Sequence, residues 1–121
     1  MAEVMTDREL LELAAKAAGI TGQCHLLTGD CCDPAEPGGF RYEHPDGGHD
    51  WWNPLMDDGD ALRLAAKLCM TIRTDNDIFA FAGFIFTHGP LVNQRIKDVG
   101  DKETAIRRAI VRAAAEVGKG V

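Results

Sequence analysis

The segment from Trp52 to Ala65 constrains the fold more than any other part of this chain. It places a proline turn, Trp52-Asn53-Pro54-Leu55, directly before an acidic cluster and an apolar helical pattern. Asp57 or Asp58 can accept hydrogen bonds from the free N–H groups of a helix start, and their charges suit the positive end of the helix dipole. We therefore predict a tight turn followed by a helix. The residues expected on the buried face of that helix are Leu62, Ala65, Ala66 and Cys69, widened by Leu64 and Leu68.

Two other helices are predicted from their end signals. Thr6 and Glu9 form a capping box before an apolar stripe, and Gly19 suits the left-handed residue that ends a helix, which predicts a helix over about 6–18. The last helix is predicted to begin at the N-cap Asp101 and to stop at Gly118. Its apolar stripe has a period of 3.6 residues: Ala105, Ile106, Ala109, Ile110, Ala113, Ala114 and Val117.

Three segments alternate or carry strand-forming residues, and they predict strands at about 40–44, 70–74 and 78–87. The last of these is apolar on both faces. Either both faces are covered, or one is an oligomer interface, or Gly83 marks a bulge. Residues 88–100 are interpreted as a loop.

These elements predict an α+β fold in which a small antiparallel sheet is packed by three helices, in the order α-β-α-β-β-α. A chain of 121 residues forms one domain by default, here 1–121 with a long Gly/Pro/Asp-rich loop at about 19–50.

Charge and composition narrow the classes of function. The net charge is −6, and residues 30–60 hold nine acids against one base, so nucleic-acid binding by bulk electrostatics is disfavoured. The chain has no apolar run long enough to span a membrane and no signal-peptide pattern at its start. We expect a cytoplasmic protein with reduced thiols.

Three segments resemble one known family. They are residues 5–19 (MTDRELLELAAKAAG), 52–65 (WNPLMDDGDALRLA) and 105–118 (AIRRAIVRAAAEVG). Together, over roughly half of the chain, they resemble the phage and prophage α-β-α sandwich domain, a group of small phage proteins without an established activity. The resemblance implies a phage-encoded protein that acts in the cytoplasm of the bacterial host. The 20–50 loop lies outside the shared pattern.

Two sets of residues are candidates for binding. Trp51, Trp52 and Asn53 stand in a turn, where a tryptophan serves either to fill the core or to anchor a partner. Arg107, Arg108 and Arg112 lie off the apolar stripe of the last helix, where they form either a solvated face or a weak nucleic-acid site.

A metal or thiol site is the alternative chemistry. Cys24, Cys31, Cys32 and His44 offer the ligands that zinc prefers, but their spacing is not that of paired structural zinc ligands. No catalytic fingerprint is present. We therefore expect no catalysis and no cofactor, zinc being the alternative. The leading hypothesis is a non-catalytic phage accessory protein that binds a host or phage protein or self-associates.

Overall fold

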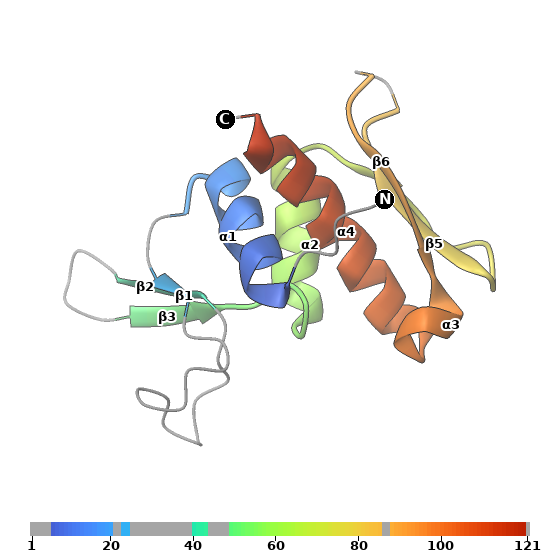
Figure 1. Ribbon diagram of the computed structural model, residues 1–121, viewed down its shortest axis with the longest axis horizontal. Helices are drawn as coiled ribbons and strands as arrows, with labels where there is room; N and C mark the ends of the chain where they lie inside the picture. The colour runs from blue at the N-terminus through green and yellow to red at the C-terminus, as the bar shows by residue number, and fades with distance from the viewer. Residues whose placement is uncertain (1–5, 21–22, 25–39, 44–48, 86–87, 121) are drawn as a thin grey trace.

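The computed structural model describes residues 6–20, 23–24, 40–43, 49–85 and 88–120, and it has an α+β fold. Helices and strands are interspersed along the described part of the chain (Figure 1). They are α1 (Asp7–Ala18), β1 (Gln23–Cys24), β2 (Phe40–Glu43), β3 (His49–Trp52), α2 (Asp58–Lys67), β4 (Thr71–Arg73), β5 (Phe79–Gly83), β6 (Leu91–Arg95), α3 (Ile96–Val99) and α4 (Lys102–Lys119). The predicted fold class is confirmed.

The strands form two separate antiparallel sheets rather than the single predicted one. Strands β1-β2-β3 make one sheet and β4-β5-β6 the other, and Figure 1 shows them on opposite sides of the helices. The predicted strands divide between two sheets because each of them finds its partners close by in sequence. Strand β2 pairs with β3, and β5 pairs with β4 and β6.

Strand β6 corrects the prediction that 88–100 is a loop. Its inward residues are Val92 and Gln94, both buried, and its outward residues are exposed. A glutamine on the buried face breaks the apolar alternation that identifies a half-buried strand, so the pattern is not recognisable. Strand β5 spans Phe79–Gly83 and is shorter than the predicted 78–87, and Gly83 pairs in regular register with Thr71 and Leu91. The bulge interpretation is therefore wrong.

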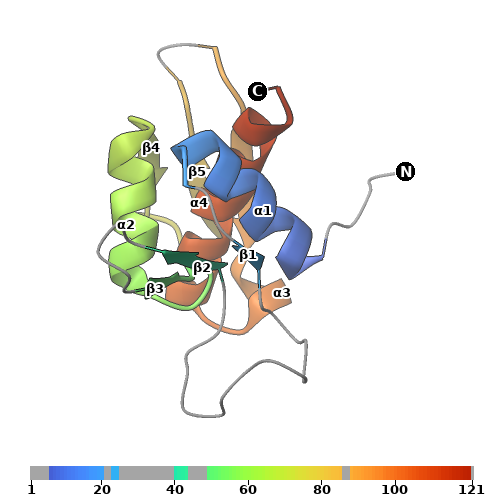
Figure 2. The same ribbon diagram turned by 90° about the vertical axis from the view of Figure 1, so that its left-hand side faces the viewer.

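Helix α4 is the centre of the molecule. It contacts α1 and α2 on one side and the β5-β6 hairpin on the other (Figures 1 and 2). The predicted caps are confirmed at the first and last helices of the chain. Thr6 and Glu9 form the capping box of α1, Gly19 ends it at φ 74°, and Asp101 accepts a hydrogen bond from Thr104 N–H at 2.7 Å. That bond lowers the pKa of Asp101.

Gly118 does not stop α4, contrary to the prediction. The helix runs on to Lys119, and Gly118 is buried where α4 meets α1. A Cβ atom at Gly118 would lie 2.0 Å from the carbonyl oxygen of Leu13. Glycine is present there because the two backbones touch, which is a tertiary requirement.

The buried face of α2 also differs from the prediction. Ala61, Leu64 and Ala65 are buried, whereas Leu62, Ala66 and Cys69 are exposed. The prediction placed the buried face too far toward Leu62. An alanine-rich helix has two apolar faces that look alike in the sequence, and packing against α4 decides which of them is buried.

Candidate functional site

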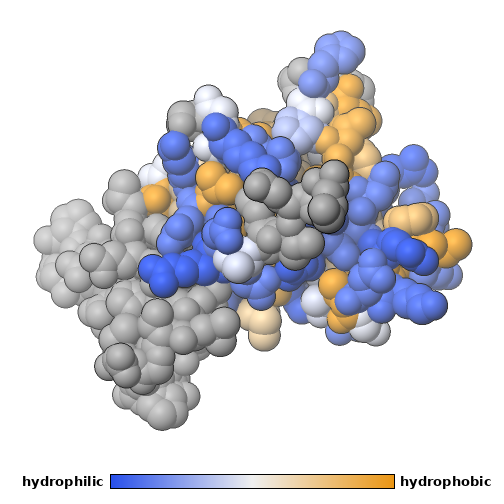
Figure 3. Space-filling view, viewed as in Figure 1, coloured by the Kyte–Doolittle hydropathy of each residue, from blue (hydrophilic) through white to orange (hydrophobic). Residues whose placement is uncertain are grey.

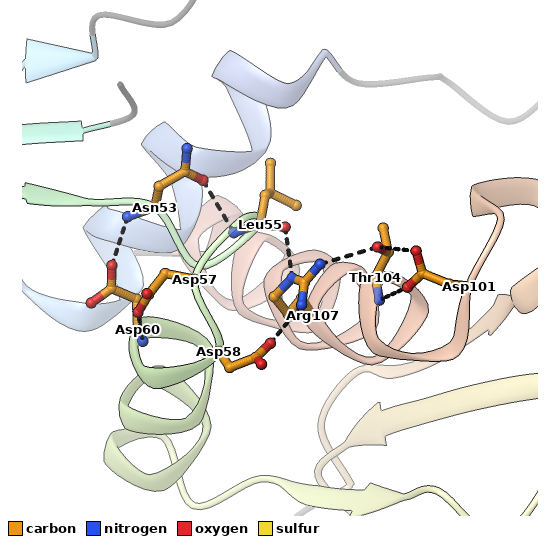
Figure 4. Close-up of polar contacts among 8 residues, drawn as sticks. All are labelled: Asn53, Leu55, Asp57, Asp58, Asp60, Asp101, Thr104 and Arg107. Atoms are coloured by element: carbon orange, nitrogen blue, oxygen red, sulfur yellow. Dashed lines mark hydrogen bonds and ion pairs between the residues drawn. The ribbon is translucent and has the colours of Figure 1, made fainter. Parts of the chain in front are cut away.

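The Trp52–Asp60 segment is held together by internal hydrogen bonds and does not form a contact surface. We call this segment the clamp. The backbone N–H of Asn53 donates to Asp60 Oδ2 at 3.0 Å, and Asn53 Oδ1 accepts from the N–H of Leu55 at 3.2 Å (Figure 4). Asp57 is the N-cap of α2 and accepts from the N–H of Asp60 at 2.8 Å. The turn and the helix start thus hold each other.

Arg107 joins this clamp to α4 (Figure 4). Its Nε donates to the carbonyl oxygen of Leu55 at 3.0 Å, and its Nη1 pairs with Asp58 Oδ1 at 2.5 Å. Its Nη2 donates to Thr104 Oγ1 at 3.0 Å. The planar guanidinium therefore spans the α2 start and the first turn of α4, a use for which its fixed fork of donors is suited.

Most of the predicted binding residues are buried or make contacts with other residues of the same chain. Trp52 and Asn53 are each 6% exposed, so they belong to the core and the turn. The side chain of Trp51 lies outside the described part. Arg108 pairs with Asp7 at 3.0 Å, and Arg112 donates to Gln94 Oε1 at 2.8 Å. These contacts do not favour a nucleic-acid site on the last helix.

The metal hypothesis falls on residues that the structure does not describe. Cys31, Cys32, His44 and the side chain of Cys24 lie outside the described ranges. Within those ranges, no group of three His, Cys, Asp or Glu residues could hold a metal ion. The acidic cluster Asp57, Asp58 and Asp60 is used by the N-cap and by ion pairs with Arg107 and Arg63.

Among the described residues, no helix or strand covers one face of the β4-β5-β6 sheet, and this face carries large apolar side chains. The inner face, with Ala80 and Ala82 fully buried, is covered by α4. On the outer face, Phe79 is 38% exposed, and hydrophobic surface gathers on the β5-β6 side of the molecule (Figure 3). The apolar residues concerned are Phe79, Phe81, Ile85 and Leu91.

The register arranges this outer face in cross-strand rows. One row contains Arg73, Phe81 and Asn93, and the next pairs Phe79 with Arg95. Side chains that face each other across antiparallel strands lie within contact distance, so each row is a continuous strip. The two phenylalanines occupy the middle strand, with polar and charged groups toward the two margins.

A shallow hollow of about 270 Å³ lies over these rows. Its lining combines three apolar side chains with polar groups from β4, the β4-β5 connection and β6: Arg73, Asp75, Asn76, Phe79, Phe81, Ile85 and Asn93. Arg73 pairs with Asp75 at 2.9 Å, and this hydrogen bond together with the charge of Arg73 holds the pKa of Asp75 below its ordinary value. Asp75 is therefore an anion at neutral pH.

Sequence reasoning recognised the apolar outer face of β5 but missed the residues of β6 that complete it. Leu91, Asn93 and Arg95 lie in the segment interpreted as a loop. No alternation in the sequence marks them, because the buried position between Asn93 and Arg95 is a glutamine.

Comparison with known proteins identifies no relative: no family model, curated protein or solved structure matches the chain. In the described part of the chain, no helix is long and apolar enough to cross a membrane.

Proposed function

We propose that this chain is a non-catalytic binding module that recognises a protein partner through the outer face of the β4-β5-β6 sheet. The resemblance of its three segments to small phage proteins supports a role as a phage or prophage accessory protein in the bacterial cytoplasm. The observation that carries the proposal is the open apolar face with its hollow.

Exposed apolar area of this kind is a source of binding energy. Burying a large apolar side chain completely contributes about 1.5–3 kcal/mol, and several partly exposed ones contribute in proportion. Contiguous apolar patches rimmed by polar groups mark interaction sites in soluble proteins. The lining also suits binding better than catalysis, because it combines apolar groups, amides and one ion pair, without a nucleophile beside a base.

The composition of the face favours a protein partner over a nucleic acid. The Arg73 charge is already balanced by Asp75, so Arg95 is left as the main attraction of the face for a phosphate backbone. Phenylalanine and arginine are instead typical of the centres of protein interfaces.

The proposal can be tested by photo-crosslinking in bacterial cells. The photoreactive residue benzoylphenylalanine is placed at Asn93, on the outer face, and in a matched variant at Leu62, which is 64% exposed on α2. We expect a discrete protein adduct from position 93 that is absent from position 62. Adding Phe79→Asp should abolish the adduct while the protein remains folded by circular dichroism. No adduct from position 93, or equal adducts from both positions, would refute the proposed surface.

A further inference from the structure

The edge of strand β6 that faces away from β5 borders the outer face, and we infer that it binds an extended segment of the partner as an added strand. The bound segment carries a large apolar residue and, two positions away from it, an acidic residue. The inference rests on the proposed function, because it names the chemical class of partner at the same surface. Strand addition takes its affinity from main-chain hydrogen bonds and its specificity from alternate side chains.

The hydrogen bonds between β5 and β6 leave other backbone groups of β6 directed away from β5. The N–H of Ile96 donates to the carbonyl oxygen of Ile78 at 3.0 Å, one residue beyond the end of the ladder. Along an antiparallel strand, successive residues direct their backbone groups to opposite sides, so this bond assigns the even-numbered residues of β6 to β5. The N–H and C=O groups of Leu91 and Asn93 therefore point to the other edge, where no described strand pairs with them.

Strand β6 offers a longer edge than β4, which borders the sheet on its other side. Strand β4 has three residues, and only Ile72 directs its backbone groups away from β5. The five residues of β6 give an edge of roughly 17 Å, which matches a peptide of about five residues. Three strands about 4.8 Å apart make a face about 14 Å wide, far smaller than the roughly 800 Å² that each partner of a standard interface buries. The face therefore suits a short segment.

The hollow accommodates the large apolar residue of the added strand. Asn93 lies between the open edge and Phe81, its cross-strand neighbour, and both residues line the hollow. Strands lie about 4.8 Å apart, so the added strand is about 9.6 Å from β5. A large side chain from the added strand and the ring of Phe81 together span that distance across the short Asn93 side chain. A small or polar residue at this position would leave the hollow unfilled.

Arg95 selects the acidic residue. It is exposed opposite Phe79, two positions beyond Asn93, so a carboxylate two positions from the apolar residue lies beside it. Among the described residues, its guanidinium has no ion pair or hydrogen bond. The charge of Arg73 is balanced by Asp75 at 2.9 Å, so the face has two positive charges against one negative. This excess complements an acidic segment.

A library of random short peptides tests the inference without assuming a sequence. Displayed peptides are selected on the immobilised full-length protein, and we expect enrichment of a large apolar residue with Asp or Glu two positions away, in one fixed order. Selection on Arg95→Glu should replace the acid by Lys or Arg at the same spacing, because the charge that it meets is reversed. Lys67→Glu is the matched reversal on the exposed side of α2, and it should select the same peptides as the unaltered protein.

The most enriched peptide, labelled with fluorescein, measures the contribution of the edge by fluorescence anisotropy. Asn93→Pro removes an N–H that points outward and no bond to β5, and edge strands tolerate proline on that side. The dissociation constant should rise at least about fivefold. Arg95→Glu should raise it by a similar factor for the acidic peptide. Circular dichroism reports whether each variant folds, and if the proline variant does not, the selection on Arg95→Glu decides.

Three results would overturn the inference. They are enriched peptides without the acid at a fixed spacing, an unchanged selection on Arg95→Glu, and an affinity unaffected by a folded Asn93→Pro.

The two proposals fail in different ways. If the crosslink from position 93 captures a partner in cells but the library yields no such motif, the binding surface stands and the added strand is refuted. An adduct that joins two copies of this chain also refutes the added acidic segment. If the library yields the motif but cells give no adduct, the specificity of the edge stands and the proposed function fails. If neither depends on the outer face, both are refuted.

Discussion

The inner and outer faces of strand β5 are both apolar, but they differ in the size of their side chains. The inner residues of β5 are Ala80 and Ala82, with no exposed surface, and the outer ones are Phe79 and Phe81. Small side chains let α4 lie close to the strands. Large side chains on the other face reach outward, where no described element covers them.

This difference shows how to interpret a strand that is apolar on both sides. A face of alanines indicates close packing against a neighbouring backbone within the protein, because any larger residue would separate the two elements. A face of partly exposed phenylalanines is the feature on which the proposed binding surface rests. The comparison can be tested by changing the covered side, where small residues are required, and the open side, where they are not.

The largest effect is expected at Gly118, which lets α4 lie against α1 behind the covered face. A methyl group there would lie 2.0 Å from the carbonyl oxygen of Leu13, so the helices must separate. We expect Gly118→Ala to lower the free energy of unfolding by about 3 kcal/mol or more. Urea denaturation measures the loss. Gly120→Ala is the control, since the nearest atom there is 3.6 Å away. Equal stabilities would contradict the close contact.

The next largest loss of stability is expected when a leucine is introduced on the inner face of the sheet, and a leucine on the outer face is the comparison. Ala82→Leu overpacks the inner face against α4 and should cost about 2–3 kcal/mol. Asn93→Leu adds a leucine on the outer face and should change the free energy of unfolding by less than about 0.5 kcal/mol. Thermal and urea denaturation measure the change in the free energy of unfolding of the two variants. If both variants lose the same stability, the two faces are not different environments.

A smaller effect is expected at the clamp that positions α4 over the inner face. Arg107→Ala removes the donor to the carbonyl oxygen of Leu55, and the loss should be about 2 kcal/mol. Arg108→Ala is the matched control, because its ion pair with Asp7 is partly exposed and should contribute less than about 1 kcal/mol. Chemical denaturation should rank the two in that order, and the reverse order would show that Arg107 is not a structural residue.

Local signals in the sequence were sufficient to predict where the helices lie, but not which residues form the candidate binding surface. The capping box at Thr6, the left-handed Gly19 and the N-caps Asp57 and Asp101 each act within a few residues. The candidate residues Trp52, Asn53 and Arg107 were conspicuous in sequence, but their prominence reflects packing and hydrogen bonds across the clamp. The residues of the open face are ordinary in sequence and become a surface through the pairing of three strands.

The sequence by itself determined the α+β class and the places where the long helices begin, because caps and apolar periodicity act over a few neighbouring residues. Tertiary structure decided that the strands form two sheets and that α2 buries Ala61 rather than Leu62. It also decided which face of β5 is covered. Those choices depend on contacts between residues distant in sequence, chiefly the packing of α4 between α1 and the β5-β6 hairpin.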